Sequence, residues 1–173
     1  MQVMSATFLP VLVGAFDPDY DERNVLDAYI DDLSVGYSGG PQLGERLLTW
    51  EELDYLGLSR RELRHRAAMA LDTMVDRVRI HGQPPTLMLS FDGLESSVLL
   101  ADDFWESLRS SVPGELVVGV PARDVVIVTG SRSPNGLARV RRAVDRMFLA
   151  GGEHLLLRQL LVWNYGHWAP FDA

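Results

Sequence analysis

LVVGVPARDVVIVTG, residues 116–130, holds two apolar runs on either side of a short polar turn. Leu116–Val120 and Val125–Thr129 are almost continuously apolar, which is typical of strands that are covered on both faces. The proline and the charged residues at 121–124 favour a tight turn between them. The stretch therefore predicts an antiparallel hairpin at the centre of a sheet.

Helices are predicted both before and after this hairpin in the sequence. Ser133-Pro134 begins a segment whose apolar residues recur at helical spacing until Gly151-Gly152. Two capping boxes, Thr-x-x-Glu at 49–52 and Ser-x-x-Glu at 59–62, each predict the start of a helix. Asp102 or Asp103 is expected to cap a fourth, shorter helix.

The other apolar segments are predicted to be strands. The alternation of Leu33, Val35 and Tyr37 within 26–37 predicts a half-buried strand that ends at 38–41. Further strands are expected at Phe8–Ala15, Leu87–Phe91 and Ser97–Leu100, with a last hairpin from Leu155 to Trp168. The predicted fold class is α+β: a mixed, mainly antiparallel sheet with about four helices packed on it, in a single domain over residues 1–173.

The composition excludes several kinds of site. The chain of 173 residues has no cysteine, so it forms no disulfide, no thiolate zinc site and no cysteine nucleophile. All 16 basic residues are arginine, which excludes a Schiff-base lysine and a Walker-type phosphate loop. No cofactor is predicted.

The amino-terminal residues indicate a cytoplasmic protein. No positive charge precedes the first apolar run, and Pro10 interrupts that run, unlike the pattern of a secretory signal. No apolar stretch approaches the roughly 18 residues that a membrane-spanning helix needs. We therefore expect no association with a membrane.

The negative charge of the chain is concentrated in its first third. The formal net charge is −8, and residues 1–56 hold 11 acidic residues against two arginines. Such a balance argues against sequence-independent binding to nucleic acid or to an anionic membrane. An acidic third instead predicts a surface for a basic protein partner.

The densest acidic stretch, DPDYDE at 17–22, has part of the spacing of a calcium loop. Asp17, Asp19 and Asp21 match the first three ligand positions of an EF-hand. Glu22 stands where that loop needs glycine, and Ala28 stands where it needs a bidentate glutamate. We therefore predict an exposed, solvated acidic loop and no metal site.

The patterns of common catalytic sites are missing. No serine lies in a Gly-x-Ser-x-Gly elbow, and the four histidines are far apart in the sequence. Gly130–Gly136 joins a predicted strand to a helix, where backbone amides can hold an anion, but Ser133 is sufficiently explained as a helix cap. No catalytic residue is predicted.

Two charged pairs remain as candidate binding residues. Asp31 and Asp32 are neighbours on a predicted strand, so they should face opposite sides and not serve one site. Arg123-Asp124 lies at the tip of the central hairpin. It is either a turn, with Arg123 paired to a carboxylate, or a fork that recognises an anionic ligand or an acidic surface.

The order of these motifs resembles the YtpQ-like family of uncharacterised bacterial proteins. The resemblance rests on LDAYIDDLSVGYSG, on ELRHRAAMAL, on LADDFWESL and above all on LVVGVPARDVVIVTGS, and it extends from Leu9 to Trp168. Family members are usually longer, with an additional amino-terminal region. Where the family has an acidic loop after the second strand of the hairpin, this chain has Ser131-Arg132-Ser133. The resemblance implies a fold but no activity.

Two hypotheses of function follow. The first, which the sequence favours, is a non-enzymatic binding protein of the immunity or antitoxin kind, whose acidic stretch (Asp17, Asp19, Asp21 and Asp32) engages a basic partner. The second is a small enzyme or small-molecule-binding protein with a cleft near Arg123, Asp124 and Asp32. A pocket with a perturbed carboxylate would favour the second, and a convex acidic face the first. The oligomeric state is left open.

Overall fold

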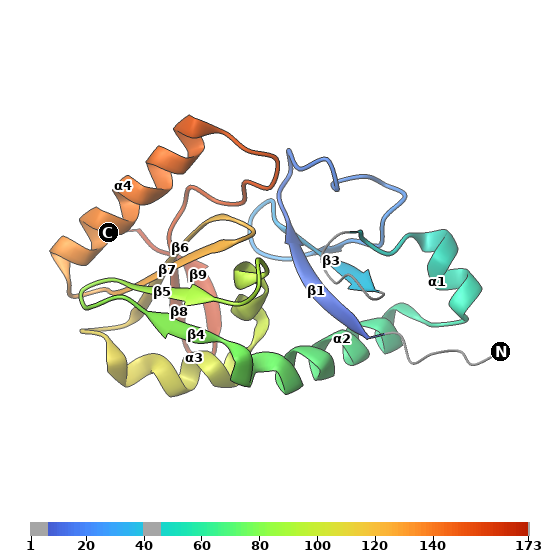
Figure 1. Cartoon of the computed structure of the whole chain (residues 1–173), viewed down its shortest axis with the longest axis horizontal. Helices are drawn as coiled ribbons and strands as arrows, with labels where there is room; N and C mark the ends of the chain where they lie inside the picture. Colours follow the sequence, from blue (N-terminus) through green and yellow to red (C-terminus); the bar gives the residue numbers. More distant parts are fainter. Residues whose placement is uncertain (1–6, 40–45, 173) are drawn as a thin grey trace.

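Two antiparallel sheets lie along the long axis of the molecule in the computed structural model, which describes residues 7–39 and 46–172 (Figure 1). The small sheet has the order β1-β3-β2 and the large sheet the order β4-β5-β7-β6-β8-β9. The strands of the small sheet are β1 (Phe8–Val13), β2 (Asp27–Ala28) and β3 (Ser34–Gly39). Those of the large sheet are β4 (Arg79–His81), β5 (Leu87–Ser90), β6 (Leu116–Ala122), β7 (Val125–Gly130), β8 (Leu161–Asn164) and β9 (His167–Pro170). The predicted α+β class is confirmed.

The central hairpin is where the sequence predicted it. β6 and β7 are the two middle strands of the large sheet, and Val118 lies opposite Val128 in their register. Helix α4 (Pro134–Ala150) packs on one face of this hairpin. Gly119 permits that packing, because a Cβ atom built on it would lie 2.6 Å from the Cγ1 atom of Val140.

Both capping boxes are confirmed. Helices α1 (Trp50–Leu56) and α2 (Arg60–Met74) begin after Thr49 and Ser59, each with the reciprocal bonds to the glutamate three residues later. α1 ends at Gly57, whose φ of 67° is accessible to glycine at little cost. Helix α3 (Asp102–Leu108) is also present, but the predicted aspartate cap is wrong: its N-cap is Ala101, which makes no side-chain capping bond.

Segment 26–37 is a hairpin and not the single half-buried strand that its alternation predicted. A turn at 30–33, in which Asp31 has a φ of 56°, separates β2 from β3. Residues 34–38 of β3 are all buried, since Leu26 and Leu47 pack over its Gly36. Of the predicted strand end at 38–41, Gly40 and Pro41 lie outside the described residues.

Three further segments differ from the sequence prediction. Ser97–Leu100 belongs to a 3-10 helix, η2 (Glu95–Leu100), and is not a strand. Residues 155–160 form an irregular connection before β8, with an isolated β-bridge from Leu155 to Ala122 and a bend at 158–159, and not the first strand of the predicted hairpin. The short strand β4 was not predicted, because it follows α2 and the 3-10 turn η1 (Val75–Arg77) within a few residues. A third 3-10 turn, η3 (Arg109–Ser111), follows α3.

The main apolar core runs through both sheets, and a second, smaller cluster lies between α4 and the large sheet. The main core contains β1 residues such as Leu12, β6 residues such as Val118, and the buried Trp105 of α3. The hydroxyl of Ser97 in η2 donates a hydrogen bond of 2.6 Å to the carbonyl oxygen of Pro10. This bond connects η2 to strand β1 of the small sheet. None of the helices in the described part of the chain has the length and apolarity to cross a lipid bilayer.

Candidate functional site

The guanidinium of Arg123 is buried at the point where the two sheets meet. Arg123 follows β6, and its side chain is 7% exposed. Its Nε donates to the carbonyl oxygen of Leu12 at 3.2 Å. Its terminal nitrogens donate to Asp17 Oδ2 at 3.0 Å and to Asp19 Oδ2 at 3.2 Å. Every nitrogen of this guanidinium therefore has an acceptor within the chain, and Arg123 is not available to recognise an external anion.

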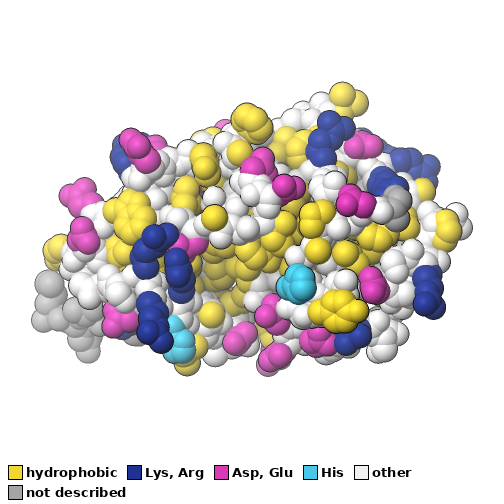
Figure 2. Space-filling model, turned by 180° about the vertical axis from the view of Figure 1, so that it is seen from behind, with side chains coloured by type: hydrophobic (Ala, Val, Ile, Leu, Met, Phe, Trp, Pro, Cys, Tyr) yellow, Lys and Arg dark blue, Asp and Glu magenta, His cyan; other side chains and the backbone are white. Residues whose placement is uncertain are grey.

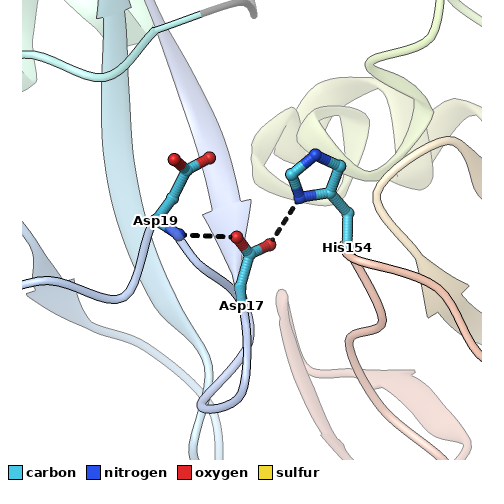
Figure 3. Close-up of side chains that lie close together, drawn as sticks. All are labelled: Asp17, Asp19 and His154. Atoms are coloured by element: carbon cyan, nitrogen blue, oxygen red, sulfur yellow. Dashed lines mark hydrogen bonds and ion pairs between the residues drawn. The ribbon is translucent and has the colours of Figure 1, made fainter.

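Asp17 lies at the centre of this cluster and joins it to a third segment. Its side chain is fully buried, and its Oδ1 accepts the backbone N–H of Asp19 at 2.8 Å. Its Oδ2 lies 2.8 Å from Nδ1 of His154, which belongs to the connection after α4 (Figure 3). A carboxylate only accepts hydrogen bonds, so Nδ1 of His154 is the donor in this contact. The other ring nitrogen, Nε2, points away from Asp17 (Figure 3).

Asp17, Asp19 and His154 are also close enough to be considered as metal ligands, since their ligand atoms lie within 4.8 Å of one another. The carboxylate oxygens involved already accept hydrogen bonds from Arg123. A cation bound there would displace or approach this guanidinium, at a cost in like-charge repulsion. The arrangement favours an internal ion cluster over a metal centre.

Other carboxylates of the acidic third are also neutralised within the chain. The guanidinium of Arg23 lowers the pKa of Asp21 to about 2 through a side-chain hydrogen bond. Asp27 accepts hydrogen bonds from Arg64, Tyr37 and Arg60, and these hold its pKa well below the ordinary range. The predicted exposed acidic loop is therefore wrong for Asp17, which is buried, and the fold itself relieves much of the repulsion between these residues.

Two adjoining cavities lie next to the ion cluster, on either side of the connection at 152–155. The first, of about 580 Å³, is lined mainly by apolar side chains, including Phe16, Phe148 and Leu156, and by the carboxylates of Asp31, Asp32 and Glu153. Asp31 and Asp32 line the same cavity because they lie in a turn; the prediction that they face opposite sides of a strand is wrong.

The second cavity, of about 480 Å³, is lined by Arg123, by His154 and by three carboxylates, those of Asp92, Asp124 and Glu153. It shares Gly152, Glu153 and Leu155 with the first. Met147 and Gly151 at the carboxyl-terminal end of α4 complete its wall. The last turn of α4 has no basic residue, so its negative dipole end is not compensated within the helix.

Glu95 is buried beside this cavity, directly after its lining residues 92–94. The residue is 9% exposed, and among the described residues Oε2 has no hydrogen-bond partner. Burial raises the pKa of Glu95, and the negative charge of Asp124 adds to that rise. Glu95 therefore adds a fourth carboxyl group to those of Asp92, Asp124 and Glu153 around the second cavity.

The structure places the predicted site residues in three settings, and Arg123 belongs to both the ion cluster and the lining of the second cavity. Asp17, Asp19 and Arg123 form the ion cluster, and Asp21 pairs with Arg23 in its own loop. Asp32 and Asp124 line the two cavities. Sequence reasoning missed His154, Glu153 and Asp92, and only the placement of glycines next to them, at 93 and 151–152, hinted at turns there.

The molecular surface combines these charges with exposed apolar groups. Hydrophobic side chains gather across the middle of the face shown in Figure 2, and acidic side chains lie above and below that band. Phe16, on the wall of the first cavity, is 99% exposed. Leu149, next to Phe148 on α4, is 90% exposed.

Comparison with known proteins places the chain among bacterial relatives of low identity. No protein-family model matches the chain, and no solved structure matches it. It is 23% identical over 171 residues to a UPF0354 protein of Staphylococcus saprophyticus, covering 94% of the chain and 58% of that protein. It is 22% identical over 173 residues to a UPF0354 protein of Bacillus cytotoxicus, covering 96% of the chain and 63% of that protein.

The chain thus spans about three fifths of the length of the curated relatives it matches. The names of these relatives state no activity, and the finer YtpQ-like assignment stays a prediction. What the comparisons do support is a similarity to UPF0354 proteins, an uncharacterised bacterial family.

Proposed function

We propose that this chain is a non-enzymatic binding module that takes a basic, partly apolar segment of a partner protein along its two adjoining cavities. The observation that carries the proposal is the lining of those cavities. Four of the carboxylates there, those of Asp31, Asp32, Asp92 and Asp124, form no ion pair with another described residue, and Glu153 lines both cavities.

The cations of the same lining leave this negative charge largely uncompensated. The guanidinium of Arg123 is occupied by Asp17 and Asp19, and Arg158 pairs with Asp145. A ligand that brings positive charge would relieve the repulsion between the free carboxylates. Complementary charge also accelerates association and excludes acidic partners.

The apolar part of the lining supports a protein segment as the occupant. The first cavity offers Phe148, Leu156 and Leu157 next to the exposed ring of Phe16. An extended chain with alternating basic and apolar side chains can place one kind in this apolar wall and the other on the carboxylates. Burial of the Phe16 ring would add the hydrophobic contribution that charge pairs alone do not supply.

The alternative is a small enzyme with a cleft near Arg123, Asp124 and Asp32, and the criterion of a pocket with a perturbed carboxylate favours it. A cleft is present at Asp124, with the perturbed Glu95 beside it, but Asp32 lines the neighbouring cavity. The side chains lining the two cavities include no hydroxyl or thiol nucleophile. The oriented His154 can accept a hydrogen bond from a bound ligand as well as take part in proton transfer.

The test is a calorimetric titration of the chain with a synthetic peptide of repeated arginine, leucine and glycine. Replacing Asp31→Asn, Asp32→Asn and Glu153→Gln together should weaken binding by about tenfold or more, because three lining charges are lost. Raising the salt to the point where the Debye length is about 8 Å should weaken it further.

A matched control removes three exposed carboxylates elsewhere: Asp72→Asn, Asp76→Asn and Asp103→Asn. These residues lie on α2, η1 and α3, outside both cavities. If the control weakens binding as much as the cavity variant, net charge alone attracts the peptide and the proposal is wrong. Equal binding of a peptide with citrulline in place of arginine would also contradict it.

A further inference from the structure

The geometry points to the second cavity as a pocket for a single arginine side chain, with His154 Nε2 as one of its hydrogen-bond acceptors. This inference rests on the proposed function and names the group that the partner segment would insert. Its basis is the ion cluster and not the number of acidic residues: Asp17, held by Arg123, fixes which nitrogen of His154 is free to accept.

The first step concerns the tautomer of His154. Asp17 Oδ2 accepts from the guanidinium of Arg123 at 3.0 Å and faces His154 Nδ1 at 2.8 Å. A ring that carries its one proton on Nδ1 presents the Nε2 lone pair. Nε2 points away from Asp17, and His154 lines the second cavity with a side chain that is 42% exposed. Among the hydrogen bonds described for the chain, Nε2 takes part in none.

The second step concerns the balance of donors and acceptors in the cavity. The one arginine in its lining, Arg123, has its donors directed to Leu12, Asp17 and Asp19. The lining therefore supplies acceptor groups: the imidazole of His154 and the carboxyl groups of Asp92, Asp124 and Glu153, three residues that are exposed to solvent. A ligand rich in donors and without acceptors satisfies such a set.

The third step is independent of these side chains. The cavity lies at the carboxyl-terminal end of α4, a helix of 17 residues whose last turn has no basic residue. The negative end of a helix dipole attracts cations.

An arginine side chain fits these conditions better than a lysine. A guanidinium carries five N–H donors in one plane and no acceptor, so it can reach several separate acceptors at once, whereas an ammonium concentrates three donors at one point. The volume of about 480 Å³ is within the range of small-ligand pockets. We therefore expect a clear preference for arginine.

The test is an NMR titration of the whole chain with Nα-acetyl-arginine methylamide as the probe, compared with the lysine and citrulline analogues. Citrulline has nearly the shape of arginine without its charge, and it should bind at least about tenfold more weakly, the loss expected for charge-assisted hydrogen bonds. Shifts should be centred on residues 92–94 and 151–155.

The decisive variants are His154→Asn and His154→Gln. The asparagine amide can still donate to Asp17 in the place of Nδ1 but offers nothing in the place of Nε2, so His154→Asn should weaken arginine binding by about fivefold or more. The glutamine amide reaches the place of Nε2, so His154→Gln should retain more of the binding. His65→Asn, on the exposed face of α2, is the matched control and should bind as the unmodified chain does. A urea unfolding curve verifies that each variant is folded.

The outcomes separate this inference from the proposed function. If the arginine–leucine peptide binds and responds to the first-cavity variant while the arginine probe does not bind, the pocket is wrong and the binding module stands. If the probe binds at 151–155 while the peptide shows no gain over it, the pocket stands and the partner-segment proposal fails. Equal affinity for arginine and citrulline, or no effect of His154→Asn in a folded variant, overturns the pocket.

Discussion

At residue 123, one guanidinium neutralises two carboxylates that lie more than 100 positions earlier in the chain. Replacing Arg123 by methionine keeps an apolar stem but leaves Asp17 buried without its cation. We expect the free energy of unfolding to fall by about 3–5 kcal/mol, because breaking a buried pair leaves an uncompensated charge. Urea unfolding of the variant and the unmodified chain near neutral pH measures this difference.

Arg158→Met is the control for that variant. Arg158 pairs with Asp145 at 3.2 Å, but both side chains are about two-thirds exposed, 65% and 66%. An exposed pair contributes little, so the change should stay within about 0.5 kcal/mol. Similar losses in the two variants would show that the Arg123 cluster is no more stabilising than a surface pair.

Asp27 gives a prediction about how the stability of the protein depends on pH. Hydrogen bonds from Arg64, Tyr37 and Arg60 hold its pKa below the unfolded value of about 4. A depressed pKa contributes stability that is present above the unfolded pKa and is lost as the pH falls toward the folded one. Asp27→Asn should therefore cost about 1.5–3 kcal/mol near neutral pH, and the difference from the unmodified chain should shrink below about pH 4. Unfolding curves between neutral pH and pH 2 measure this difference, with the exposed Asp76→Asn as the control. If the stability difference between Asp27→Asn and the unmodified chain stayed constant over that range, the lowered pKa of Asp27 would be contradicted.

Among the elements, helix α2 owes its start to Ser59. The hydroxyl of Ser59 accepts from the backbone N–H of Glu62 at 3.1 Å, and the carboxylate of Glu62 accepts from the backbone N–H of Ser59 at 2.9 Å. Ser59→Ala should lower stability by about 0.5–2 kcal/mol. The denaturation midpoint measures the effect. The control, Ser59→Asp, retains an N-cap acceptor and should lose much less stability. Equal losses of stability in the two variants would argue against the cap.

The central strands give the second prediction at this scale. Val118 of β6 is fully buried in the main core, between β7 and β8. Val118→Ala should cost about 1–3 kcal/mol through lost burial and the cavity left behind. Thermal and urea unfolding measure it, with Val125→Ala at the half-buried start of β7 as the milder comparison. A loss no larger than that of Val125→Ala would place Val118 outside the core.

The elements that the sequence predicted well are those with a local signal. The central hairpin follows from its continuous apolar runs, and α1, α2 and α4 follow from caps within four residues of their first turn. Segment 26–37 failed because apolar alternation at 33–37 was extended across a turn that only the φ of Asp31 reveals. Ser97–Leu100 failed because a short apolar run fits a buried 3-10 turn as well as a strand.

For the whole molecule, the candidate site could be predicted only in part. The sequence picked out Arg123-Asp124 as a polar pair at a hairpin tip, and the structure places Arg123 in an ion pair there. Its partners, Asp17 and Asp19, come from the other sheet, so their pairing depends on topology and not on spacing. The same holds for His154, whose role arises from the buried carboxylate beside it.

The ion cluster also has a consequence for the order of folding. Asp17 meets Arg123 across 106 positions and His154 across 137, so the cluster closes only after both sheets have been brought together. We expect its bonds to be absent from the folding transition state. In stopped-flow experiments, Arg123→Met should then leave the refolding rate nearly unchanged and accelerate unfolding by about 100-fold or more. The cluster would thus determine how long the native protein persists once it has formed.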